Sequence, residues 1–118
     1  MSNVRSLMAL FRGFEIQVLR LLVTPDLGAP VVESLIREAE LVSYKYSGSG
    51  YFLTVKHPSL PERRIVCSEP QVVGHFGNIQ SGFVAFVGNG ELMLECHTWG
   101  EVDVPANFRE QSVVVAAT

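Results

Sequence analysis

The chain has 118 residues and a formal net charge of -3 at pH 7. This length fits one domain that buries a core of its own. Hydrophobic residues make up 47% of the sequence and charged residues 18%, which excludes a disordered chain. The densest basic spot is Arg63–Arg64, and a nucleic-acid binder needs a basic surface, so that class is excluded as well. We expect a single domain over residues 1–118, helical over 1–40 and an antiparallel sheet over 41–118.

The mean hydropathy of +0.25 is high for a small protein. It suggests that some apolar surface is hidden in an oligomer or beneath a partner. The N-terminal apolar run is too short for a signal peptide, and no segment reaches the roughly 18–20 apolar residues of a membrane helix. Cys67 and Cys96 lie in apolar runs, which predicts buried, reduced thiols. We therefore expect a cytoplasmic protein that contacts neither membranes nor nucleic acid.

Two amphipathic helices are expected at the N-terminus. The first spans Asn3 to Val23, capped by Ser2 or Asn3, with apolar residues at steps of three and four: Val4, Leu7, Phe11, Phe14, Val18, Leu21 and Leu22. A strand over Phe14–Val18 is a competing interpretation, because polar and apolar residues alternate there. A second helix begins at Pro30, where the missing N–H costs nothing, and Glu33 and Arg37 on its outer side suit an ion pair. Its buried stripe comprises Val31, Val32, Leu35, Ile36 and Ala39.

A hairpin should follow, because apolar and polar residues alternate on both sides of Ser47-Gly48-Ser49-Gly50. A two-residue loop at Gly48-Ser49 pairs residues 46, 44 and 42 with 51, 53 and 55: Tyr46 with Tyr51, Tyr44 with Leu53 and Val42 with Val55. Extended structure resumes from Arg63 to Ser68, with Ile65 and Cys67 on one face. The glycines and prolines between Pro70 and Ser81 predict a loop across the sheet, with a weak strand at residues 71–73.

The strongest hairpin signal is Asn89-Gly90, flanked by two apolar runs. A type I′ turn there pairs Val87 with Leu92, Ala85 with Leu94 and Phe83 with Cys96, all on one apolar face. The other face pairs Phe86 with Met93 and Val84 with Glu95, and a three-residue turn would shift this register by one. Residues 112–116 are expected to form the last strand. The predicted fold is α+β, with two N-terminal helices packed on one face of an antiparallel β-meander of five to six strands.

Three stretches carry a family resemblance: Phe14-Glu15 with Val18-Leu19 and Leu21-Leu22, Ser47 to Leu53, and Gly82 to Glu95. Together they resemble a family of short, uncharacterised bacterial proteins. Those proteins have an N-terminal FE..VL..L helix, a G.GYF hairpin and a GF..F...G.L.LE hairpin followed by an aromatic residue and a proline. In this chain Trp99 precedes Pro105 by six positions, whereas the family's tryptophan tends to adjoin the proline. The resemblance implies no activity.

The candidate site is the mixed face of the last hairpin, where four side chains should gather: Met93, Glu95, His97 and Trp99. An aromatic residue among charged neighbours on an open sheet face is typical of a protein interface. Glu95 and His97 could also form an acid–base pair. Cys96 cannot be the nucleophile for His97, because adjacent strand residues point to opposite faces.

No metal site or cofactor is predicted. His57, His75 and His97 lack short metal-ligand spacing, Cys67 has no mark of a reactive thiol, and the glycines around His75 open no helix that could bind phosphate. The first hypothesis is a non-catalytic interaction domain, accessory or immunity-type, that binds a protein partner or itself as a homodimer. The alternative is a small-molecule-binding or catalytic domain that uses His57, His97 or Glu95 in a pocket between helices and sheet.

Overall fold

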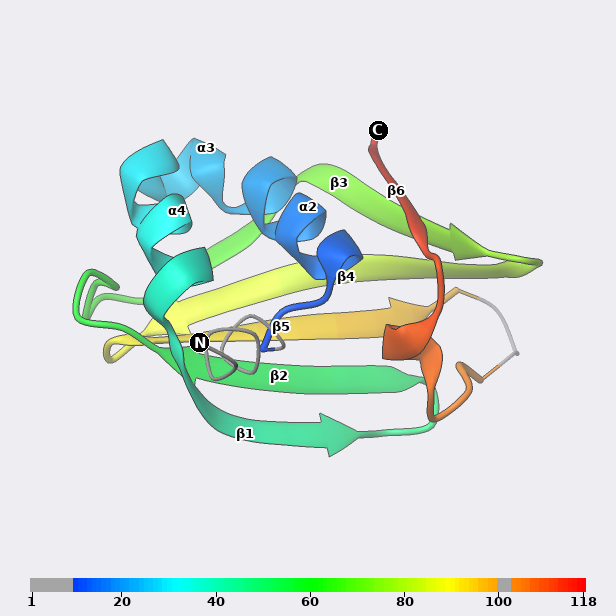
Figure 1. Cartoon of the computed structure of the whole chain (residues 1–118). Coiled ribbons are helices and arrows are strands. Elements are labelled where there is room, and N and C mark those ends of the chain that lie inside the picture. The colour runs from blue at the N-terminus through cyan, green and yellow to red at the C-terminus, as the bar shows by residue number, and fades with distance from the viewer. Residues whose placement is uncertain (1–9, 100–102) are drawn as a thin grey trace, which may run out of the picture.

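The structure is a computed structural model that describes residues 10–99 and 103–118. In Figure 1 the helices lie together on one face of an antiparallel sheet, so the predicted α+β class is confirmed. The helices are α2 (Gly13–Leu22), α3 (Thr24–Leu27), α4 (Ala29–Glu38) and the 3-10 helix η1 (Phe108–Glu110). The strands are β1 (Glu40–Tyr46), β2 (Gly50–Lys56), β3 (Ile65–Phe76), β4 (Ile79–Gly88), β5 (Glu91–Thr98) and β6 (Val114–Ala117).

The strand order is β1-β2-β5-β4-β3-β6, which is not the simple meander predicted from sequence. The β3–β4–β5 unit is itself a meander, but its last strand returns beside β2. The final strand, β6, then pairs with β3 at the far edge. This order places β5, which carries the predicted site residues, in the middle of the sheet between β2 and β4.

The first helix starts later than the stripe predicts. Residues 10–12 are not helical and α2 begins at Gly13, while the expected cap at Ser2 or Asn3 lies outside the described residues. The prediction for Leu21 is wrong, because its side chain is 37% exposed. The buried face instead comprises Phe14, Glu15, Val18, Leu19 and Leu22, a stripe of helical period that also rules out the strand interpretation.

The second helix is confirmed, with Pro30 in its first turn and Val32 and Leu35 buried. Glu33, however, accepts its hydrogen bonds from Arg20 of α2, at 2.9 Å from Nε and 2.8 Å from Nη2. The predicted partner Arg37 instead lies with its Nη2 atom 4.0 Å from the carboxylate of Glu38. An inter-helix pair therefore replaces the expected pair within the helix.

Both hairpins form where the sequence places them. Asn89 and Gly90 have φ of 54° and 73°, as a type I′ turn requires, and the predicted β4–β5 register is confirmed throughout. In the β1–β2 hairpin the pairs at Tyr46 and Tyr44 are confirmed. The third is wrong, because a bulge between Leu41 and Ser43 places Leu41 rather than Val42 opposite Val55.

The loop predicted for residues 70–81 is wrong. β3 runs through Pro70 to Phe76, and a two-residue turn at Gly77-Asn78 leads into β4 at Ile79. Pro70 lies in the irregular segment between Cys67 and Val72, where the hydrogen-bond ladder to β4 is interrupted. The N–H that proline lacks is therefore not needed for pairing with β4. Glycine is required at position 74 of this strand, because an added Cβ would lie 2.8 Å from Val113 Cγ1.

The core lies between the helices and the sheet face that they cover. Alternate residues of three central strands enter it: Tyr51, Leu53, Val55, Phe83, Ala85, Val87, Leu92, Leu94 and Cys96. The opposite sheet face, which we call the open face, has no described helix on it (Figure 1). None of the helices in the described ranges is both long and apolar enough to cross a membrane.

Candidate interaction surface

The predicted site residues lie on the open face. Met93, Glu95 and His97 are partly exposed and alternate along β5 with Leu92, Leu94 and Cys96, which are buried in the core. Trp99 follows the strand and is 39% exposed. The period of two therefore separates the core from the candidate surface as the sequence predicts.

The neighbouring strands add apolar side chains around these residues. Met93 lies opposite Thr54 on one side and Phe86 on the other, and Phe86 is followed across the sheet by Val66. Glu95 lies between Phe52 and Val84. The open-face patch comprises the apolar residues Phe52, Val66, Val84, Phe86 and Met93, with Glu95 in their midst.

Exposure makes this patch available for contact. Val66 is 58% and Phe86 is 37% exposed, and Phe52, Val84 and Met93 are partly exposed. Within the described part of the chain, the Glu95 carboxylate makes no hydrogen bond or ion pair. A carboxylate surrounded by apolar side chains suits recognition of a partner that carries a hydrogen-bond donor or a cation.

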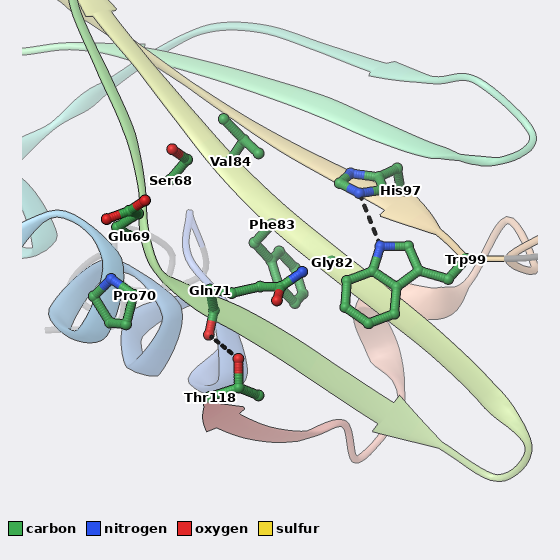
Figure 2. A pocket seen from close by; sticks show the side chains of 10 residues that line it. All are labelled: Ser68, Glu69, Pro70, Gln71, Gly82, Phe83, Val84, His97, Trp99 and Thr118. Carbon is green, nitrogen blue, oxygen red and sulfur yellow. Dashed lines mark hydrogen bonds between the residues drawn. The ribbon is translucent and has the colours of Figure 1, made fainter.

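His97 and Trp99 form a separate unit beside the patch. The Trp99 Nε1–H donates to His97 Nε2 at 3.1 Å (Figure 2), so the neutral imidazole carries its proton on Nδ1. That Nδ1 atom is buried and has no hydrogen-bond partner among the described residues. A Cβ on Gly82 would lie 2.8 Å from Trp99 Nε1 and 2.9 Å from His97 Nε2. Glycine at position 82 is therefore what lets the indole lie against the sheet.

Two hollows open on this face. One, of about 510 Å³, is lined by His97, Trp99 and Gly82 together with Ser68, Glu69 and Gln71 of the irregular part of β3 (Figure 2). The other, of about 310 Å³, contains Met93, Phe86 and Val66. The four predicted residues thus do not share one cavity, because Glu95 lies between the two hollows and lines neither.

The predicted site omits several residues that the structure places on this surface. The hairpin register already places Phe86 beside Met93 and Val84 beside Glu95, so that signal is present in the sequence. Phe52 and Val66 come from β2 and β3, and their positions depend on a strand order that local patterns do not determine. Gly77-Asn78, a recognised hairpin dipeptide, is the signal that would have identified the full β3–β4 pair.

A second polar cluster lies at the other end of the sheet. His57 Nδ1 is 2.7 Å from Ser59 Oγ and also accepts the Ser59 backbone N–H at 3.1 Å. His57 Nε2 is 3.1 Å from Glu38 Oε1 of α4. With Nδ1 as the acceptor, Nε2 carries the proton and donates to Glu38. This hydroxyl–imidazole–carboxylate series has the connectivity of a nucleophile, a base and an orienting acid, and it also fastens the turn after β2 to α4.

The remaining reactive residues form no metal site. Among residues 10–99 and 103–118, no group of three His, Cys, Asp or Glu side chains could hold a metal ion. Cys67 and Cys96 are both free and buried. Burial raises the pKa of each thiol to about 12, with Asp26 adding to the effect at Cys67. Such thiols stay protonated and unreactive near neutral pH.

Comparison with protein-family models found no match to this chain. Comparisons with curated proteins and with solved structures also found no significant match. The resemblance to short bacterial proteins therefore stays a prediction.

Proposed function

We propose that this chain is a small, cytosolic, non-catalytic protein-interaction domain, of bacterial accessory or immunity type, that binds its protein partner through the open-face patch. One observation carries the proposal: side chains from four adjacent strands, β2, β5, β4 and β3, form a largely apolar surface around Glu95 on the sheet face opposite the helices. A sheet with one covered face normally alternates apolar and polar residues. Here the second face also carries large apolar side chains.

Burial of such a surface favours association. Each Å² of apolar surface removed from water contributes about 25 cal/mol. Phe86 and Met93 are side chains of the kind that serve as interface anchors, and Trp99 lies at the border of the patch. Two free, buried cysteines fit a reducing compartment. Self-association is part of the same proposal, since the high apolar content suits a homodimer as well.

The experiment compares two variants matched in exposure. Phe86 on the open face and Leu21 on α2 are each 37% exposed, so Phe86→Ser and Leu21→Ser expose similar polar replacements on opposite sides of the molecule. Tagged wild-type and variant chains are used to capture binding proteins, and the affinity of the captured partner is then measured. We expect Phe86→Ser to weaken binding by about 30-fold or more, as loss of an aromatic anchor does, and Leu21→Ser to leave it unchanged. Equal binding by all three chains would contradict the proposal.

A second candidate function rests on the Ser59–His57–Glu38 series, whose hydrogen bonds could support acyl transfer with Ser59 as nucleophile. A fluorophosphonate probe, which labels activated serines, tests it directly. Labelling that is lost in Ser59→Ala and reduced in Glu38→Gln would favour a hydrolase. An unlabelled wild-type protein would remove this candidate.

A further inference from the structure

The first strand of the sheet is an edge strand with an unusually apolar exposed surface. All seven residues of β1 are exposed, and the strand has a neighbour on one side only among the described strands. Leu41 is 55% and Tyr44 is 40% exposed. Unpaired backbone groups on the outer side of such an edge are a template for another strand.

The bulge in β1 arranges its charged and apolar residues on separate faces. Glu40 lies opposite Lys56 and Lys45 lies opposite Phe52, so both charges are on the open face. Without the bulge, residues 40 and 45 would point to opposite faces, because five positions separate them. Leu41 and Tyr44 lie opposite Val55 and Leu53, so both point to the helix-covered face.

We propose that β1 pairs antiparallel with β1 of a second copy of this chain, about a two-fold axis at Ser43. In β1 the bulge between Leu41 and Ser43 contains one extra residue, which is not counted in the register. This register then places Lys45 opposite Glu40 of the partner subunit. It places Tyr44 opposite Leu41 of the partner subunit. Both contacts occur twice, because the two-fold axis makes the interface self-complementary. The two six-stranded sheets become one continuous sheet.

Charge complementarity is the reason to choose a second copy as the occupant of this edge. β1 has Glu40 at its start and Lys45 near its end, so antiparallel self-pairing brings opposite charges together. Parallel pairing would oppose like charges. The backbone groups of the edge gain partners, and the exposed Leu41 and Tyr44 are buried against each other. This proposal specifies the homodimer of the proposed function, but it does not involve the open-face patch, so either can fail alone.

Light scattering and sedimentation over a dilution series test the assembly. The wild-type chain should have twice the chain mass of 13.0 kDa at high concentration. Lys45→Glu and Glu40→Lys, each of which opposes like charges twice, should each raise the dissociation constant about tenfold or more. The double variant restores opposite charges between the subunits and should recover the dimer, although the exposed Glu40–Lys56 ion pair within each chain is lost. Arg63→Glu, which changes an exposed residue outside β1, is the net-charge control for Lys45→Glu and should dimerise like the wild type.

Cross-linking tests the register independently. Ser43 lies on the proposed axis, so Ser43→Cys should form an intermolecular disulfide under mild oxidation, because directly opposite strand residues satisfy disulfide geometry. Ser68→Cys, exposed on β3, should not. A monomeric wild-type chain would overturn the proposal. A dimer that ignores the charge reversals and in which Ser43→Cys forms no cross-link would overturn it too, and would instead place self-association on another surface.

Discussion

Glu15 of α2 and Arg109 of η1 form a buried, two-pronged ion pair, although 94 positions separate them in the chain. Arg109 Nε lies 2.7 Å from Glu15 Oε2, and Arg109 Nη2 lies 2.8 Å from Oε1. Glu15 also accepts hydrogen bonds from the Tyr51 hydroxyl and the Arg12 backbone N–H. The pair therefore connects α2, β2 and the segment that precedes β6.

Loss of one partner should be costly, because it leaves the other charge buried and unpaired. We expect Arg109→Met to lower the free energy of unfolding by about 3–5 kcal/mol. Adding Glu15→Leu to this variant should recover part of the loss, since a buried ion pair can often be replaced by packed apolar side chains. Arg20→Met, which breaks an exposed pair with Glu33, is the control and should have little effect. Urea unfolding curves measure the free energy of unfolding of all three variants. Equal losses of stability in Arg20→Met and Arg109→Met would contradict this expectation.

Two glycines on either side of His97 should respond differently to alanine. At Gly82 the added Cβ meets the mobile ends of Trp99 and His97, so Gly82→Ala should shift the indole and break its hydrogen bond while the chain still folds. At Gly50 the Cβ would lie 1.7 Å from the Cys96 carbonyl oxygen, so Gly50→Ala must disrupt the pairing of β2 with β5. Because Trp99 is the single tryptophan, its fluorescence should change in Gly82→Ala. Circular dichroism should show loss of structure in Gly50→Ala only.

Alanine should also have opposite effects at Gly90 and Gly13. Gly90 has φ of 73° in the β4–β5 turn, where a Cβ is strained, so Gly90→Ala should destabilise the chain by about 1 kcal/mol. Gly13 begins α2, and a Cβ added there would meet nothing within 4 Å, so Gly13→Ala should stabilise the chain by about 0.5–1 kcal/mol. Thermal unfolding of the two variants measures whether each substitution raises or lowers stability. A loss at Gly13 would show that the start of α2 depends on more than helix propensity.

Alkaline pH should destabilise the fold through its two buried thiols. Burial raises the pKa of Cys67 and Cys96 from 9.0 to about 12, and the pKa of Tyr51 is raised as well. Above pH 9 the unfolded chain therefore loses protons that the folded chain retains. Stability is fully present below pH 9 and falls as pH rises towards 12, by at most about 1.4 kcal/mol per pH unit for each thiol. Urea unfolding under reducing conditions should show this slope, and the Cys67→Ala, Cys96→Ala double variant should reduce it to the part that Tyr51 contributes above pH 10.0.

Much of the fold was predictable because it depends on local patterns. The Asn89-Gly90 turn fixed the β4–β5 register, and from that register the period of two placed Met93, Glu95 and His97 away from the core. The β3 prediction failed because Pro70 and Gly74 suggest a loop when considered alone. The irregular segment of β3 accommodates the proline, and close packing of Val113 requires the glycine, and both depend on tertiary neighbours.

Local sequence patterns were sufficient for the α+β class, the two hairpin turns and the face on which each β5 side chain lies, since turn chemistry and alternation act over a few residues. Three other relationships depend on the complete fold: the place of β5 between β2 and β4, the contribution of Phe52 and Val66 to the patch, and the contact of Glu15 with Arg109. These relationships join residues far apart in the chain. They form because burial of whole strands and helices against one another stabilises them. No local sequence pattern specifies which distant segments pack together.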